Sequence, residues 1–355
     1  DTFNPADTIN EKYLLLKSIY ASSKKQIYLG INLESLDNVI VKRFINRIPV
    51  DLNGTLNEDL AHNEFHSIQA INSETDVAEK AFDLIERKDD TLLIIEDIPG
   101  TTIVKLEYEK QINLIDDVFA ALQKIHHHGF IHGDFKPTNI IWTKDKIKII
   151  DWENAGRIGA SFITNSGTPG YLISKDKFPN NNIIFDYYAF VFYLVSIALK
   201  YDVSYLPDNL SFIKTTLNNL NYPKLSLLVS KLRNINNETD YDIKEIEIEI
   251  QESISELKIN NSIASQVVFN TANNEQGIID ETLTFISRFC VKKEGKVYWR
   301  NNHLFPDFNL EGINLGSSGI IIGLLSLEYL SDNSGKFEEV ITSSAFGLCN
   351  ENISK

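Results

Sequence analysis

The sequence predicts an α+β fold in which a small sheet-rich lobe precedes a helical lobe. Short apolar runs separated by polar breaks between residues 18 and 44 are typical of a hairpin or small meander, and residues 91–95 form a continuous apolar strand. From residue 186 onward the pattern is mostly helical. The length of 355 residues suits more than one domain, and 43% hydrophobic residues can supply their cores.

The individual elements follow from the spacing of apolar residues. Steps of three and four residues predict helices at residues 56–71, 112–126, 186–201, 211–220, 224–233 and 243–257. Two short strands, 140–143 and 147–150, flank a tight charged turn. A polar stretch rich in Asn and Ser follows residue 258 and is typical of a linker. Beyond it we expect helices at residues 278–289 and 320–330, with a small-residue turn at 316–319.

Charge and cysteine content exclude several classes of protein. Lys and Arg number 34 against 49 Asp and Glu, which gives a net charge of −15. This acidity disfavours nonspecific binding to nucleic acid or to an anionic membrane, although it could attract a basic peptide. The two cysteines, Cys290 and Cys349, cannot form a disulfide framework and suit the reducing cytoplasm. No apolar run approaches the roughly 20 residues that span a membrane.

Four polar residues in segment 131–153 indicate phosphoryl transfer from a nucleoside triphosphate. Asp134 could orient an attacking hydroxyl and accept its proton, while Lys136 neutralises charge on the transferring group. Asn139 and Asp151 could hold Mg²⁺, which prefers oxygen ligands. The alternative interpretation is a chance acidic loop between two strands.

These residues resemble the protein-kinase superfamily, whose catalytic loop runs His-Arg-Asp-Leu-Lys-Pro-any-Asn and whose metal loop is Asp-Phe-Gly. The resemblance implies that Lys42 anchors phosphates and that Glu64, on the next helix, is its ion-pair partner. Glu96, Asp97 and Ile98 would form the hinge whose backbone meets the nucleotide base. The expected phosphate-covering turn, residues 21–26, contains no glycine, so its backbone amides and lysines are the groups available to phosphate.

Downstream residues extend the resemblance. The loop of Gly167, Thr168, Pro169, Gly170 and Tyr171 looks like the peptide-substrate loop of protein kinases. Asp186 looks like the buried helix aspartate that braces the catalytic loop, whereas residues 173–175 lack the family's usual Ala-Pro-Glu. Three consecutive histidines, 126–128, cannot converge on one metal from a helix, so we expect a solvated helix end there.

At two positions the sequence differs from the usual protein-kinase motifs, and these differences indicate a particular branch of the superfamily. Gly133 stands in place of Arg, and Asp151-Trp152-Glu153 in place of Asp-Phe-Gly, as in aminoglycoside and choline phosphotransferases. Combined with the loop 167–171, this mixture is similar to the kinase domain of class III lanthipeptide synthetases, which are ordered lyase, kinase, cyclase. Residues 314–320 are similar to the opening of the cyclase α/α toroid.

The resemblance implies a bilobal protein-kinase-like fold followed by an all-α, toroid-like segment. The expected parts are an N-lobe at residues 1–100, a C-lobe at 101–258, a linker at 259–274 and an incomplete cyclase-like domain at 275–355. The implied enzyme uses ATP or GTP with Mg²⁺ to phosphorylate Ser and Thr of a ribosomal precursor peptide, its partner. A lyase domain, expected before Asp1, would then eliminate phosphate, and thioether rings would form on Cys.

Two other functions remain open. One is a small-molecule phosphotransferase that acts on an antibiotic or an amino alcohol, which would not need the loop 167–171. The other is a pseudokinase scaffold that binds a leader peptide without transferring phosphate. Magnesium-dependent nucleotide binding would distinguish the scaffold from an enzyme.

Overall fold

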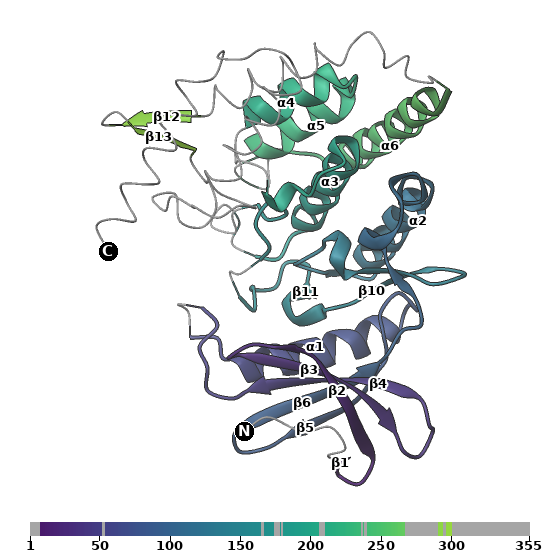
Figure 1. The fold of residues 1–355 in the computed structure, drawn as a ribbon, viewed down its shortest axis with the longest axis vertical. Helices are drawn as coiled ribbons and strands as arrows, with labels where there is room; N and C mark the ends of the chain where they lie inside the picture. The colour runs from purple at the N-terminus through teal and green to yellow at the C-terminus, as the bar shows by residue number, and fades with distance from the viewer. Residues whose placement is uncertain are drawn as a thin grey trace. The chain divides into compact units, whose positions relative to one another are not determined.

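The computed structural model describes residues 8–266, except 52–53, 165–166, 174–177, 179, 206–209, 236 and 238–239, together with two strands at 290–293 and 296–299. By its internal contacts the chain divides into two compact units, residues 1–263 and 264–355. All elements that form the candidate site belong to the first unit (Figure 1). No helix in the described part of the chain is long and apolar enough to cross a bilayer.

A six-stranded antiparallel sheet forms the predicted sheet-rich lobe (Figure 1). Its spatial order is β1-β2-β3-β4-β6-β5. The strands are β1 (Thr8–Ile9), β2 (Tyr13–Ala21), β3 (Lys25–Asn32), β4 (Asn38–Ile45), β5 (Ala81–Glu86) and β6 (Asp90–Glu96). The meander predicted at residues 18–44 is therefore present, whereas β5, an edge strand of mixed polarity, was not predicted.

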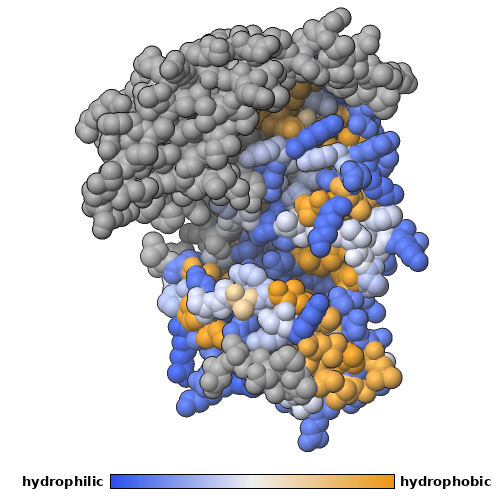
Figure 2. Space-filling view, viewed as in Figure 1, coloured by the Kyte–Doolittle hydropathy of each residue, from blue (hydrophilic) through white to orange (hydrophobic). Residues whose placement is uncertain are grey.

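Strand β6 lies between β4 and β5 and is buried on both faces, which explains its continuous apolar sequence. Leu93 and Ile95 face the main core, while Leu92 and Ile94 face a smaller core on the other side of the sheet. This alternation follows from the two-residue period of a strand. Exposed apolar side chains nevertheless remain on β2, and Figure 2 shows hydrophobic residues gathered on the surface of this lobe.

One helix, α1 (Asn57–Asn72), packs against this sheet through Leu60, Ile68 and Ile71. Its first turn is fixed because the Asp59 side chain accepts a hydrogen bond from the Leu56 backbone N–H, 2.8 Å away. The same buried face of α1 carries Glu64, whose burial is unusual for a carboxylate and requires a charged partner.

The helical lobe begins with β7 (Thr101–Thr102) and α2 (Tyr108–His127) and continues through short strands that border the candidate site. These strands are β8 (Phe130–Ile131), β9 (Ile140–Trp142), β10 (Ile147–Ile149) and β11 (Gly156–Arg157). Four helices follow: α3 (Ile183–Leu199), α4 (Leu210–Asn219), α5 (Pro223–Asn234) and α6 (Ile243–Gln266). All correspond to helices predicted from sequence, with shifted ends.

Helix α3 is the centre of this lobe. It is apolar around its whole circumference, and nearly all of its residues are buried. The side chain of Asn182 caps its first turn by accepting a hydrogen bond from the Ile184 N–H at 3.0 Å. Asp186, one turn into this apolar helix, is therefore held at a fixed position in the core.

Two sequence expectations need correction at the end of the first unit. Helix α6 continues to Gln266, so the first part of the predicted linker 259–274 is helical. Within the segment expected to be all-α, the structure describes an antiparallel pair, β12 (Cys290–Lys293) and β13 (Lys296–Trp299). Its Val, Tyr and Trp residues favour strand over helix. The toroid-like residues 314–320 lie outside the described residues.

Candidate active site

The loop between β8 and β9 carries the residues predicted to transfer a phosphoryl group. Lys136 Nζ lies 2.6 Å from Asp134 Oδ2, and the Asn139 side-chain amide donates to the Asp134 carbonyl oxygen at 3.1 Å. Thr168 reaches the same carboxylate from the loop 167–171. The structure thus brings together the predicted base, the predicted cation and the predicted substrate loop.

Asp186 braces this loop from α3, as expected for a buried helix aspartate. Its carboxylate accepts hydrogen bonds from the backbone N–H groups of His132 at 2.7 Å and Gly133 at 2.9 Å. Burial alone would raise the pKa of Asp186, but hydrogen bonds from the His126 side chain and the His132 backbone hold that pKa below its usual value. An ionised carboxylate therefore fixes the backbone just before Asp134.

His126 supplies a further contact that the sequence analysis missed. Its Nε2 lies 3.0 Å from Asp186 Oδ2, and its side chain is buried. The expectation of a solvated helix end at residues 126–128 was therefore wrong for His126. The helical period could have predicted that His126 is buried, since it lies four residues after the buried Leu122.

Gly133 is required by the backbone at this point. It has a positive φ of 78°, and an added Cβ would lie 2.2 Å from the carbonyl oxygen of Asn154. The left-handed conformation and the close approach both exclude larger side chains. This geometry explains why the Arg of the related loop is replaced by Gly here.

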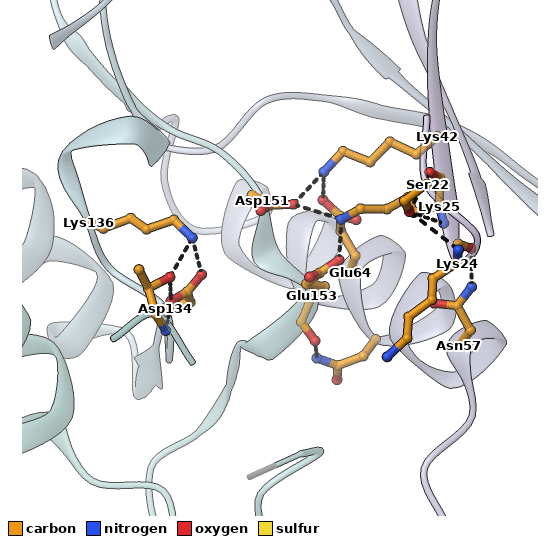
Figure 3. Close-up of polar contacts among 12 residues, drawn as sticks. Ser22, Lys24, Lys25, Lys42, Asn57, Glu64, Asp134, Lys136, Asp151 and Glu153 are labelled. Atoms are coloured by element: carbon orange, nitrogen blue, oxygen red, sulfur yellow. Dashed lines mark hydrogen bonds and ion pairs between the residues drawn. The ribbon is translucent and has the colours of Figure 1, made fainter. Parts of the chain in front are cut away.

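A second cluster surrounds Asp151 at the end of β10. Lys42 from β4 places its Nζ 2.8 Å from Asp151 Oδ1 and 2.5 Å from Glu64 Oε1 (Figure 3). Burial disfavours a charged lysine, but Asp151 and Glu64 outweigh it and raise the pKa of Lys42 well above its usual value. The predicted ion pair between β4 and α1 is thus present as a buried contact.

Asp151 remains ionised because positively charged lysines surround it. Burial alone would raise its pKa, but the charges of Lys42, Lys25 and Lys136 hold the pKa of Asp151 well below its usual value. Because Lys136 belongs to the first cluster, the two clusters share one electrostatic site. Among the described residues, the side-chain hydrogen bond of Asn139 uses its amide nitrogen, so its side-chain oxygen and the Asp151 carboxylate suit a magnesium ion.

Glu79 positions the Asp151 loop and was not predicted. It is fully buried and accepts hydrogen bonds from the Trp152 indole N–H at 3.1 Å and, more weakly, from the Asp151 N–H at 3.4 Å. Burial raises the pKa of Glu79 to about 8. No local pattern marks this residue, because only the tertiary fold brings it to residues 151 and 152.

Lys25 and Glu153 also enter the site. Lys25 Nζ lies 2.6 Å from Glu153 Oε2 and 3.6 Å from Asp151 Oδ1. Asn63 of α1 fixes this segment by donating its amide to the carbonyl oxygens of Glu153 and Ala155. The sequence analysis assigned Lys25 to the phosphate-covering turn, but no sequence pattern indicated that Lys25 pairs with Glu153.

The predicted hinge lies where expected along the chain, directly after β6. The Glu96 backbone N–H donates to the Lys80 carbonyl at 2.8 Å, and its side chain accepts from the Lys80 N–H at 3.1 Å. Asp97 and Ile98 follow and are partly buried. The side chain of Glu96 is thus used to join the strand to residue 80.

The predicted substrate loop, residues 167–171, is fixed to the core at its C-terminal end. Tyr171 is buried, and its hydroxyl lies 3.0 Å from Ser196 Oγ and 3.2 Å from Asp202 Oδ1. Gly170 has a positive φ, and an added Cβ would approach the Val203 carbonyl at 2.7 Å. Pro169 is exposed, and Ile173 is buried. Tyr171 therefore holds the loop in place, while residues 174 and 175 lie outside the described residues.

Part of this chain is similar in sequence to known protein kinases. Residues 23–174 match the family described as protein kinase domain. Over 104 residues the chain is 31% identical to serine/threonine-protein kinase PknG of Mycobacterium leprae, covering 25% of this chain and 14% of that protein. It is 25% identical over 186 residues to the carbon catabolite-derepressing protein kinase of Candida albicans, covering 48% and 28% of the two chains.

Among solved structures, the autoinhibited serine kinase domain of titin aligns with a TM-score of 0.49 and 15% identity, covering 70% of this chain and 80% of that one. The chain spans well under half the length of the two curated relatives. The family match encloses Lys25, Lys42, Asp134 and Asp151, the residues that meet in the site. Residues 23–174 therefore match the protein kinase domain, and this part of the chain has a kinase-like fold.

Proposed function

We propose that this chain transfers the γ-phosphoryl group of a nucleoside triphosphate to a Ser or Thr hydroxyl of a peptide. The observation that carries this proposal is the position of Thr168. Its Oγ1 donates to Asp134 Oδ1 at 2.8 Å and accepts from Lys136 Nζ at 2.7 Å. The loop 167–171 thus contacts the proposed base directly. A small-molecule phosphotransferase does not need this loop.

The geometry leaves Asp134 able to act as that base. A carboxylate offers about four acceptor positions. Among the described residues, three are used, by Lys136 Nζ and by the backbone N–H and hydroxyl of Thr168. The remaining position can accept the hydrogen bond of a substrate hydroxyl and then its proton, while Lys136 neutralises charge on the transferring group.

We propose that the cluster around Asp151 binds the nucleotide. Lys42, held by Glu64, would contact the phosphates, and the hinge at residues 96–98 would meet the base. Asn139 and Asp151 would hold Mg²⁺, which would neutralise phosphate charge during transfer. The nucleotide we propose is ATP or GTP.

For the substrate we propose a ribosomal precursor peptide, phosphorylated in the cytoplasm as the first step of lanthionine formation. The support is the combination of Gly133 and Asp151-Trp152-Glu153 with the loop 167–171. The family match and the serine/threonine kinase relatives support phosphorylation of Ser and Thr. A lyase domain and a cyclase domain would then complete the reaction.

The test is a substrate panel. The chain is incubated with ATP, Mg²⁺ and one of three acceptors: Ser- and Thr-containing peptides, aminoglycosides, or choline. The masses of the products are measured by mass spectrometry. We expect phosphate on peptides alone. Phosphorylated aminoglycoside or choline, with no phosphopeptide, would support the small-molecule phosphotransferase instead. Nucleotide binding without transfer to any of them would support the scaffold.

A further inference from the structure

In the turn between β2 and β3, three backbone N–H groups already have hydrogen-bond partners within the turn. The backbone N–H groups of Lys24 and Lys25 both donate to Ser22 Oγ, at 3.3 and 3.0 Å. The Ser22 N–H in turn donates to the Lys25 carbonyl oxygen at 2.9 Å. Because these three amides are already satisfied, a phosphate contact from this turn would rely largely on its side chains.

Of the two lysines in this turn, Lys25 reaches the site. Its Nζ contacts Glu153 and Asp151, and its side chain is only 18% exposed. Lys24 is exposed, and the described residues contain no ion pair of its ammonium group (Figure 3). Burial alone would lower the pKa of Lys25, but Asp151 and Glu153 outweigh it and raise that pKa, so Lys25 is charged.

The position of this ammonium group is one that a metal ion could also take. Glu64, Asp151 and Glu153 each offer a carboxylate oxygen, and these atoms lie within 4.8 Å of one another. Glu64 is fully buried, and its Oε2 has no hydrogen-bond partner within the described part of the chain. Buried carboxylates without enough donors are stabilised by any cation that approaches them.

We propose that Lys25 is a tethered cation that occupies the Asp151–Glu153 carboxylates in the nucleotide-free protein and moves to the phosphates when the magnesium nucleotide binds. This proposal rests on the proposed function. A divalent ion binds carboxylate oxygens more strongly than an ammonium group does, so metal entry releases the lysine. The flexible four-carbon stem of Lys25 then allows its charge to follow the phosphates, replacing the glycine-rich loop.

The test compares Lys25→Gln with Lys24→Gln, which removes the same charge from the same turn. Mn²⁺ binding is titrated without nucleotide, and binding of Mg²⁺-ATP is titrated separately. We expect Lys25→Gln to bind Mn²⁺ roughly three- to tenfold more tightly, because the competing ammonium is gone, and to bind Mg²⁺-ATP roughly tenfold more weakly. Lys24→Gln should stay within about twofold of the wild type in both titrations.

The loss of Mg²⁺-ATP affinity distinguishes this role from a structural ion pair, because removing a purely structural ion pair would free the same carboxylates for metal without weakening Mg²⁺-ATP binding. Unchanged or weaker Mn²⁺ binding by Lys25→Gln would overturn the proposal, as would unchanged Mg²⁺-ATP binding. If Lys25→Gln does not fold, Glu153→Gln serves instead. It should weaken Mn²⁺ binding, and an unchanged Mn²⁺ affinity would count against a shared cation position.

The Mn²⁺ titration needs no phosphoryl acceptor. Its result therefore stands apart from the substrate panel. A wild-type chain that phosphorylates nothing would contradict the proposed function and leave the competition between Lys25 and metal measurable.

Discussion

At the residue scale, the site depends on carboxyl groups whose charge is set by their surroundings. Asp151 and Asp186 stay ionised because cations or hydrogen-bond donors face them. Glu79 differs, because burial raises its pKa to about 8 although Lys42 opposes this. Neighbouring acids in one site thus hold different protonation states at neutral pH.

The raised pKa of Glu79 predicts a pH dependence of stability. The unfolded chain releases this proton near pH 4.5, whereas the folded chain keeps it until about pH 8. The folded state therefore binds more protons between these values, and its stability falls as pH rises through that window. Glu79→Gln, which keeps an oxygen for the Trp152 indole, should lose less stability between pH 5.5 and 8.5.

The measurement is the free energy of unfolding in urea for both proteins at several pH values. Between pH 5.5 and 8.5, the wild type should lose a few kcal/mol more unfolding free energy than Glu79→Gln. Parallel curves for wild type and Glu79→Gln would show that Glu79 does not titrate as proposed.

A second prediction at this scale concerns Asp151. Asp151→Asn removes a charge from the proposed magnesium ligand and leaves Lys42 and Lys25 with one carboxylate fewer. We expect the dissociation constant of Mg²⁺-ATP, measured by calorimetry, to rise at least about tenfold. Binding of ATP without metal should change much less, and equal losses in both titrations would exclude a metal-specific role.

At the element scale, the loop 132–139 is held between α2, α3 and the segment after β10. Asp186 and His126 brace it from the two helices. Gly133 lets it pass against the Asn154 carbonyl. The loop therefore depends on close backbone contact as much as on its polar side chains.

Gly133→Ala tests this contact. The matched control is Gly159→Ala, since Gly159 has a similar positive φ of 80° but no atom within 4 Å of an added Cβ. Both changes carry the left-handed penalty of about 1–2 kcal/mol, and only Gly133→Ala adds a backbone clash. We expect chemical denaturation to show a loss for Gly133→Ala that is greater by roughly 1–3 kcal/mol. Equal losses would mean that the loop shifts to accommodate the methyl group.

Sequence patterns predicted elements better than they predicted contacts. The helices at α1, α2 and α3 and the strand β6 have strong periodic or continuous apolar signals, so their existence was predictable. The pairing of Lys25 with Glu153 joins residues 128 positions apart, and no local period encodes it. Lys42 and Glu64 could be paired in advance only through a family resemblance.

At the scale of the whole molecule, the proposal predicts where the reaction stops. Elimination of phosphate needs a base at the α-proton and a pocket for the departing phosphate, whereas the proposed site would hold its groups for in-line transfer. With a precursor peptide, mass spectrometry should show added phosphate and no loss of water. Adding a separately made lyase domain should then give dehydrated peptide. Dehydration by this chain alone would contradict the proposed division of labour.

The central claim is that Asp134 is the base of a phosphoryl transfer to peptide hydroxyls. The most direct measurement is the transfer of labelled γ-phosphate from ATP to a Ser- and Thr-containing peptide by wild type and by Asp134→Asn. We predict that Asp134→Asn binds Mg²⁺-ATP almost normally and transfers phosphate at least about 100-fold more slowly. Transfer at the wild-type rate by Asp134→Asn would contradict the assignment of the base.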